Sequence, residues 1–184
     1  MTTAIFLIIA LLILAGLWIV SVQRKLVSSD ELCKNALSQI GVQQSSRWDA
    51  LSALAELVKS YSEHEYKTIS DVIARRAAVG RDSSPTDADA QEELLGTALR
   101  SINVVAEQYP QLKANENYIK AMDSVNTYEN QVRMSRMVFN DTVTKFNRMT
   151  RQFPDSAVAS MLGFRAKEYL QENQEKSGMP SMKI

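Results

Sequence analysis

The chain is poor in the residues that build most catalytic and metal sites. It has one cysteine, Cys33, and one histidine, His64, in 184 residues. A single cysteine excludes an intrachain disulfide, and we interpret Cys33 as a small core residue. His64 lacks the second histidine that a zinc-binding helix or a di-iron bundle site requires. The sequence therefore predicts no metal and no cofactor.

Glycine and proline are also scarce, with six and four residues respectively. No glycine-rich phosphate loop is present, and no run of alternating β-branched residues predicts a strand. Adjacent carboxylates such as Glu92 and Glu93 do not face each other on a helix. We therefore predict an all-α protein that is not an enzyme.

The chain has no excess of charge of either sign, because 21 basic residues balance 21 acidic residues. A nucleic-acid-binding domain would favour a basic face, so we expect no nucleic-acid partner. Arg24 and Lys25 are the basic pair nearest the apolar N-terminal region. This pair by itself is too short for a polybasic lipid-binding cluster.

An uncharged apolar run of nineteen residues, residues 4–22, is the strongest positive signal. As a helix it spans roughly 28 Å, close to the thickness of a bilayer core. Its candidate anchor residues are Ala4, Ile5, Phe6, Leu7, Leu11, Leu12, Leu14, Leu17, Trp18 and Val20. A cleaved signal peptide would have a basic start and a small-residue cleavage site, which this run lacks. We predict an uncleaved single-pass anchor in the cell membrane with lipid as a partner.

The basic residues that flank the run predict its orientation. No lysine or arginine precedes the run, whereas Arg24, Lys25 and Lys34 follow it closely. The positive-inside rule then places the N-terminus outside and the body in the cytoplasm. We divide the chain into an anchor at 1–23, a helical bundle at 24–176 and a C-terminal tail at 177–184.

The body reads as about four long helices separated by loop signals. The expected helices cover residues 24–79, 86–109, 111–152 and 154–175. The first continues the membrane helix, Thr86 caps the second, and Pro154 begins the fourth. Amphipathic helices of this length bury their apolar faces against each other, so we predict a long antiparallel bundle with coiled-coil spacing. Whether the chain reverses or only kinks at residues 109–110 stays open.

Charged residues interrupt the apolar positions of this bundle. Glu129 and Arg136 fall where core residues are expected in the third helix, as Arg47 and Glu65 do in the first segment. A buried charge is costly without a partner, so we predict a polar core layer made of these four residues. The alternative is a local twist that moves Glu129 and Arg136 to the rim.

Short motifs follow one another along most of the chain. They include Ser38-Gln39-Ile40, Arg47, Val58-Lys59, His64-Glu65, Tyr109-Pro110, Leu112-Lys113-Ala114, Glu129-Asn130, Arg136, Asn140, Asn147, Phe153-Pro154 and Gly163-Phe164. In this order and spacing the chain resembles the LemA family of bacterial membrane proteins, from the anchor to about Tyr169. The resemblance implies an N-terminal anchor and an antiparallel helical bundle, and it supplies no catalytic residues. A proline that is usual between residues 51 and 54 is absent, which predicts a straighter first helix.

We expect the protein to act through its surfaces. The leading hypothesis is a non-catalytic, membrane-anchored helical scaffold that assembles as a homo-oligomer and organises or shapes the membrane. The alternative is an adaptor or regulator of another membrane protein, such as a membrane protease. A third possibility is signal transduction through the long helix, but the sequence contains no recognisable output domain for it.

Overall fold

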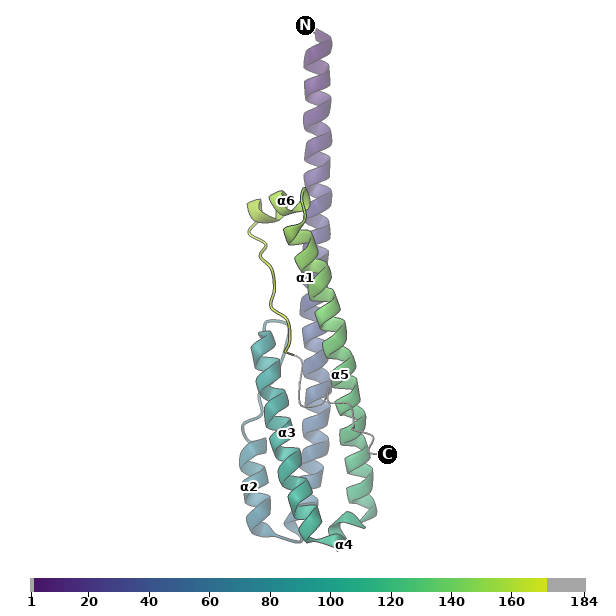
Figure 1. The fold of residues 1–184 in the computed structure, drawn as a ribbon, viewed down its shortest axis with the longest axis vertical. Helices are drawn as coiled ribbons and strands as arrows, with labels where there is room; N and C mark the ends of the chain where they lie inside the picture. Colours follow the sequence, from purple (N-terminus) through teal and green to yellow (C-terminus); the bar gives the residue numbers. More distant parts are fainter. Residues whose placement is uncertain (1, 172–184) are drawn as a thin grey trace, which may run out of the picture.

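The computed structural model describes residues 2–171, and these residues form helices and connecting segments without a strand (Figure 1). The helices are α1 (Thr2–Lys59), α2 (Glu63–Ile73), α3 (Pro85–Gln108), α4 (Pro110–Lys113), α5 (Glu116–Arg151) and α6 (Asp155–Met161). The all-α prediction is confirmed. The predicted tail at 177–184 lies outside the described residues.

Helix α1 is 58 residues long, which corresponds to roughly 87 Å at about 1.5 Å per residue. Its N-terminal part extends alone beyond the bundle, while its C-terminal part packs inside the bundle (Figure 1). Within the described chain, α1 is the one helix long and apolar enough to cross a membrane, and only 6% of its apolar window is buried. The apolar run therefore continues into the body without a break, as predicted.

The first segment ends earlier than expected. Instead of continuing to residue 79, α1 ends at Lys59 and the chain turns back into α2. Ser62 caps the second helix, since its hydroxyl accepts a hydrogen bond from the backbone N–H of Glu65 at 3.4 Å. The apolar spacing spanned this turn, so the periodicity alone did not reveal the break.

Helix α3 begins with a cap two residues before the predicted one. Ser84, not Thr86, caps the helix in a reciprocal pair with Asp87. The Asp87 backbone N–H donates to the Ser84 hydroxyl at 3.1 Å, and the Ser84 N–H donates to the Asp87 carboxylate at 2.7 Å. These hydrogen bonds hold the pKa of the Asp87 carboxyl below its usual value. Pro85 then occupies the first turn, where a missing N–H is harmless.

The chain reverses at residues 109–115 through the single turn of α4. Helix α3 runs away from the anchor and α5 runs back toward it, antiparallel to both α1 and α3 (Figure 1). The Asn115 side chain caps α5 by accepting from the backbone N–H of Asn117 at 2.8 Å. This settles the direction that the sequence left open.

The predicted fourth helix is largely absent. Helix α6 covers only Asp155–Met161, and Gly163, with φ of 78°, follows its end. Glycine adopts this left-handed backbone conformation without strain, and the chain changes direction at this residue. Residues 162–171, which we call the strap, turn at Leu162 and Gly163 and then run back along the bundle without forming helix or strand (Figure 1). Residues 172–175 of the predicted helix lie outside the described part.

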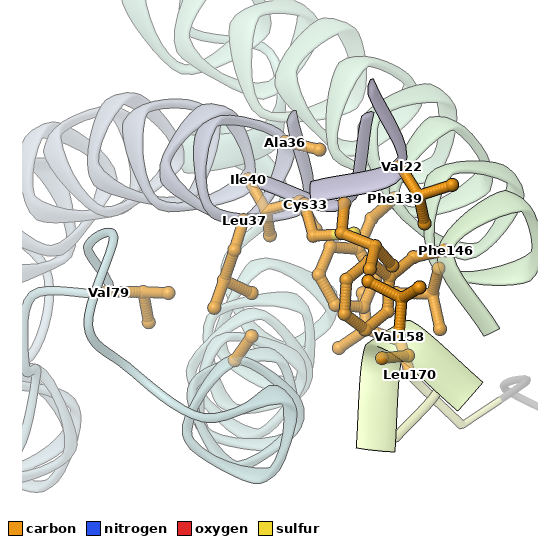
Figure 2. Close-up of a cluster of buried hydrophobic side chains, with 14 residues drawn as sticks. Val22, Cys33, Ala36, Leu37, Ile40, Val79, Phe139, Phe146, Val158 and Leu170 are labelled. Carbon is orange, nitrogen blue, oxygen red and sulfur yellow. The ribbon is translucent and has the colours of Figure 1, made fainter. Parts of the chain in front are cut away.

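The core is divided along α1 into two clusters. The proximal cluster, nearer the apolar run, includes Val22, Leu26, Cys33, Leu37, Ile40, Phe139, Val143, Phe146, Val158 and Leu170 (Figure 2). The distal cluster includes Trp48, Leu51, Leu54, Val58, Leu95, Ile102, Leu112, Tyr118 and Val125. Most of the predicted apolar positions of α1, α3 and α5 are buried in these clusters. Each fully buried Leu or Ile contributes about 1.5–3 kcal/mol, so the two clusters hold the helices together.

Candidate functional site

A polar layer separates the two apolar clusters. Helix α1 contributes Gln44 and Arg47 between Ile40 and Trp48, and both polar side chains are at most 2% exposed. Helix α3 contributes Glu92, and α5 contributes Glu129, with exposed side-chain fractions of 12% and 17%. We use "polar layer" for Gln44, Arg47, Glu92 and Glu129.

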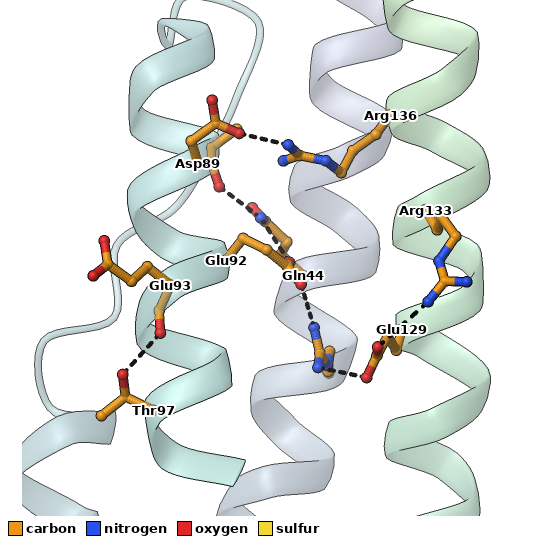
Figure 3. Close-up of polar contacts among 10 residues, drawn as sticks. Gln44, Asp89, Glu92, Glu93, Thr97, Glu129, Arg133 and Arg136 are labelled. Carbon is orange, nitrogen blue, oxygen red and sulfur yellow. Dashed lines mark hydrogen bonds and ion pairs between the residues drawn. The ribbon is translucent and has the colours of Figure 1, made fainter. Parts of the chain in front are cut away.

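Arg47 is the centre of the polar layer. Its guanidinium donates to Glu92 at 2.7 Å and to Glu129 at 2.9 Å, so one cation joins α1 to both α3 and α5 (Figure 3). Gln44 adds a hydrogen bond from its amide to the backbone oxygen of Ala88 at 2.9 Å. Two carboxylates around one buried cation leave a formal charge of −1. Arg133 on the rim moderates that charge at 3.7 Å from Glu129.

Arg136 lies in a second ion pair on the anchor side of this network, about two helical turns from Glu129 along α5. It approaches the carboxylate of Asp89 at 2.7 Å, and the two side chains are 14% and 21% exposed. It also donates to the backbone oxygen of Gln171 in the strap at 2.5 Å. Arg136 therefore ties the strap to the bundle.

The four predicted layer residues do not all meet. Arg47 and Glu129 are in direct contact, Arg136 pairs with Asp89, and Glu65 lies half-buried on α2 beside its Ser62 cap. The predicted layer lacked the α3 partners Asp89 and Glu92, because Glu92 was considered as a neighbour of Glu93 rather than as a core residue. A signal was available, since Glu92 follows Ala88 and precedes Leu95 at the spacing of the buried face of α3.

Two asparagines of α5 hold the strap by its backbone. The Asn147 amide donates to the Lys167 oxygen at 2.9 Å and accepts from the Lys167 N–H at 2.7 Å. Asn140 makes the same pair of bonds to Leu170, at 3.3 Å and 3.0 Å. Seven helical residues rise about 10.5 Å, which matches three residues of extended chain. Both asparagines belong to the motifs that carry the family resemblance, but no local pattern in the sequence indicates their role.

A cavity of about 410 Å³ lies where the strap, α1, α5 and the loop before α3 meet, and it is lined in part by Cys33, Leu37, Phe139, Arg81 and Lys167. Burial raises the pKa of the Cys33 thiol, and the reactive thiolate is correspondingly disfavoured. His64 is exposed on α2 and far along the chain from this thiol. Among the described residues that line the cavity, none is a histidine that could pair with this thiol.

Ion pairs rim the same cavity. Burial by itself would raise the pKa of Asp30, but hydrogen bonds from Lys167 and Lys34 outweigh it and hold that pKa below its usual value. The Asp30–Lys167 pair, at 2.8 Å, joins the strap to α1, and Arg81 pairs with Glu31. Among residues 2–171 no group of three or more His, Cys, Asp or Glu side chains could hold a metal ion. The arrangement is suited to fastening segments together.

These features define the class of protein: a bundle of α-helices, entered by a long N-terminal apolar helix, with charged side chains between two apolar core clusters. The chain belongs to the LemA family, whose model matches residues 36–183. It is similar to magnetosome proteins MamQ 1 and MamQ 2 of Paramagnetospirillum magneticum, at 27% identity over 121 residues in each case. Each match covers 66% of this chain and 40% of the relative, so the chain spans about two-fifths of the curated relatives it matches.

Proposed function

We propose that this protein is a non-catalytic, membrane-anchored helical scaffold that assembles with copies of itself and organises or shapes the membrane. The observation that carries the proposal is an uncharged outer surface on α1, the helix that also forms the anchor. The LemA family and the similarity to magnetosome proteins support membrane association. The assembly is our inference from the surfaces.

The α1 outer stripe faces away from the core. Its members follow alternating spacings of three and four: Ser28, Leu32, Asn35, Gln39, Val42 and Ser46. This spacing is that of a coiled-coil seam. The stripe carries no charge, and its two large apolar side chains, Leu32 and Val42, are 55% and 53% exposed. A second helix packed here would bury them.

Helix α5 has a complementary surface, the α5 outer patch. It consists of Met134, Met137 and Val138, which are 60%, 55% and 53% exposed. Their spacing places them on one side of α5, opposite the buried Val132 and Phe139. Unbranched methionine adapts its shape to a partner surface, as this kind of contact requires.

The two surfaces suit a head-to-tail contact between copies. If the α1 outer stripe of one copy meets the α5 outer patch of the next, the contact repeats and forms a ring or a row. Because α1 is continuous from Thr2 to Lys59, the packing of the bodies then fixes the arrangement of the anchors. Anchors held at fixed spacing would organise the lipid around them.

The test is the mass of the full chain in nanodiscs, together with its appearance by electron microscopy. We expect a regular particle of many chains, and we expect Leu32→Arg with Val42→Arg to reduce it to one or two chains. The matched control is Val104→Arg on α3, which is equally exposed at 53% but lies off both surfaces. A wild-type mass of one chain would refute the assembly and favour an adaptor. If Leu32→Arg with Val42→Arg leaves the particle intact, the α1 outer stripe is not the interface between copies.

The body is proposed to lie in the cytoplasm, on the side of Arg24, Lys25 and Lys34. Trypsin added to intact spheroplasts should leave the body uncut, and lysis should expose it. Digestion of the body in intact spheroplasts would reverse this orientation.

A further inference from the structure

Helix α6 lies beside α1 at the level where the apolar run ends. Val158 and Ala159 of α6 are buried in the same cluster as Val22 and Leu26, and Ile19 packs against that cluster. Figure 1 shows α6 at the end of the bundle from which the anchor emerges, lying across the long axis of the molecule. In a membrane spanned by residues 4–22, α6 would therefore lie at the membrane surface.

Large apolar side chains at both ends of α6 are unusually exposed. Phe153, just before the helix, is 86% exposed, which is the largest value among the exposed large hydrophobic residues of the described chain. Met161 at the end of α6 is 78% exposed, and Leu162 is 44% exposed. Phe153 and Met161 therefore stand at the two ends of this seven-residue helix. Residues 152–164 contain one charge, that of Asp155.

Basic residues flank this apolar surface along the chain and on the part of α1 nearest to it. Arg148 and Arg151 form the last turn of α5, Arg165 follows α6, and Arg24 and Lys25 follow the anchor. All five are exposed, and none makes an ion pair with a carboxylate within residues 2–171. From the sequence alone, Arg24 and Lys25 were too few for a lipid-binding cluster. The fold brings three arginines to the same end of the bundle.

We propose that α6 and its flanking turns form a second membrane contact, which binds an anionic lipid surface. Phe153, Met161 and Leu162 enter the interfacial region, and the flanking cations bind lipid phosphates. The inference rests on the proposed anchor, because the anchor brings α6 to the bilayer. A lipid surface fits better than a protein partner, because α6 packs against α1 beside the end of the apolar run. Two contacts would fix the tilt of the bundle relative to the membrane.

The first experiment measures depth with a single environment-sensitive fluorophore on the full chain, in a Cys33→Ala background. The label is placed by Met161→Cys, with Leu12→Cys as the anchor control and Ile119→Cys, 48% exposed at the far end of the bundle, as the aqueous control. The chain is reconstituted in phosphatidylcholine–phosphatidylglycerol vesicles with brominated acyl chains. We expect quenching at 161 several-fold above that at 119 and close to that at 12.

Each other outcome overturns the proposal in a distinguishable way. Quenching at 12 but not at 161 would refute the α6 contact and leave the anchor intact. A label at 161 that is unquenched but shifted to shorter wavelength would show that a second protein copy covers α6. Absence of quenching at 12 would refute the anchor itself, and the α6 contact with it.

The second experiment tests the role of the cations. Arg148→Gln, Arg151→Gln and Arg165→Gln together should abolish the dependence of quenching at 161 on phosphatidylglycerol. Equal dependence in this variant and in its control would show that the arginines do not bind the headgroups. The matched control removes three exposed cations from the distal part of the bundle: Arg100→Gln, Lys113→Gln and Lys120→Gln.

Discussion

Replacing Arg47 with methionine tests the energetic role of the polar layer. Methionine retains most of the side-chain volume, but it removes the cation between Glu92 at 2.7 Å and Glu129 at 2.9 Å. The two carboxylates, which are 12% and 17% exposed, would then lack their shared partner. Water reaches them only in part, so their charge is poorly solvated.

The expected loss follows from the burial of this network. Breaking a buried ion pair by removing one partner destabilises a protein by about 3–5 kcal/mol. For a chain of this size each kcal/mol lowers the melting temperature by about 2–4 °C, so Arg47→Met should lower it by about 6–20 °C. The measurement is thermal unfolding of the full chain in detergent, followed by the far-ultraviolet circular dichroism of its helices.

A matched control separates burial from charge. Arg76→Met removes an ion pair with Asp49 at 3.3 Å, whose side chains are 52% and 71% exposed. Exposed pairs contribute about 0–1 kcal/mol, so this variant should melt within a few degrees of the wild type. Equal melting temperatures for the two variants would refute the argument that burial makes Arg47 important.

A compensating variant identifies the origin of the loss. Adding Glu92→Gln and Glu129→Gln to Arg47→Met removes the two carboxylates that had shared the Arg47 guanidinium. Because the penalty arises from uncompensated charge, most of the lost stability should return. If the triple variant is no more stable than Arg47→Met, packing around the lost guanidinium dominates instead.

Three further predictions concern packing and the strap. Gly41→Ala should destabilise the protein by about 1–3 kcal/mol, because the new Cβ would collide with the backbone of Val79 in the loop packed against α1. At Gly96 a new Cβ meets only ordinary contacts, so Gly96→Ala should be neutral or stabilising in the same thermal unfolding experiment. Asn147→Ala removes both hydrogen bonds to the backbone of Lys167 and should accelerate tryptic cleavage within residues 162–171. The control Asn126→Ala, at an exposed position, should leave the cleavage rate unchanged. Equal cleavage rates in the two variants would show that Asn147 does not hold the strap. Since burial raises the pKa of Cys33, its thiol should resist maleimide at neutral pH and react only on unfolding, and fast labelling of the folded chain would contradict this.

Periodicity in the sequence predicted most of the helical core. The apolar positions at alternating spacings of three and four predicted that Leu37, Leu51, Val125 and Val143 are buried, and they are. Such a pattern is local, because each turn of helix places its own side chains on one face. The ends of helices were less well predicted. The turn after Lys59 depends on one serine cap and interrupts the apolar pattern only briefly.

The candidate site needed contacts that no local pattern contains. Arg47 meets residues 45 and 82 positions away, and the sequence did not show that Glu92 would be one of them. Which carboxylate faces a buried cation depends on how three helices align. The strap is a similar case, because it has no hydrogen-bond ladder of its own and is ordered by asparagine side chains of another helix.

The sequence by itself determined that this is a helical protein with one long apolar run, because hydrophobic length and spacing act within a single segment. It also determined that buried charges must find partners, since unpaired burial is costly. The tertiary structure decided which partners these are, where the chain reverses and how the strap is held. It also decided that α6 and its neighbouring arginines lie beside the end of the apolar run, because only packing brings residues 148–165 next to residues 19–26.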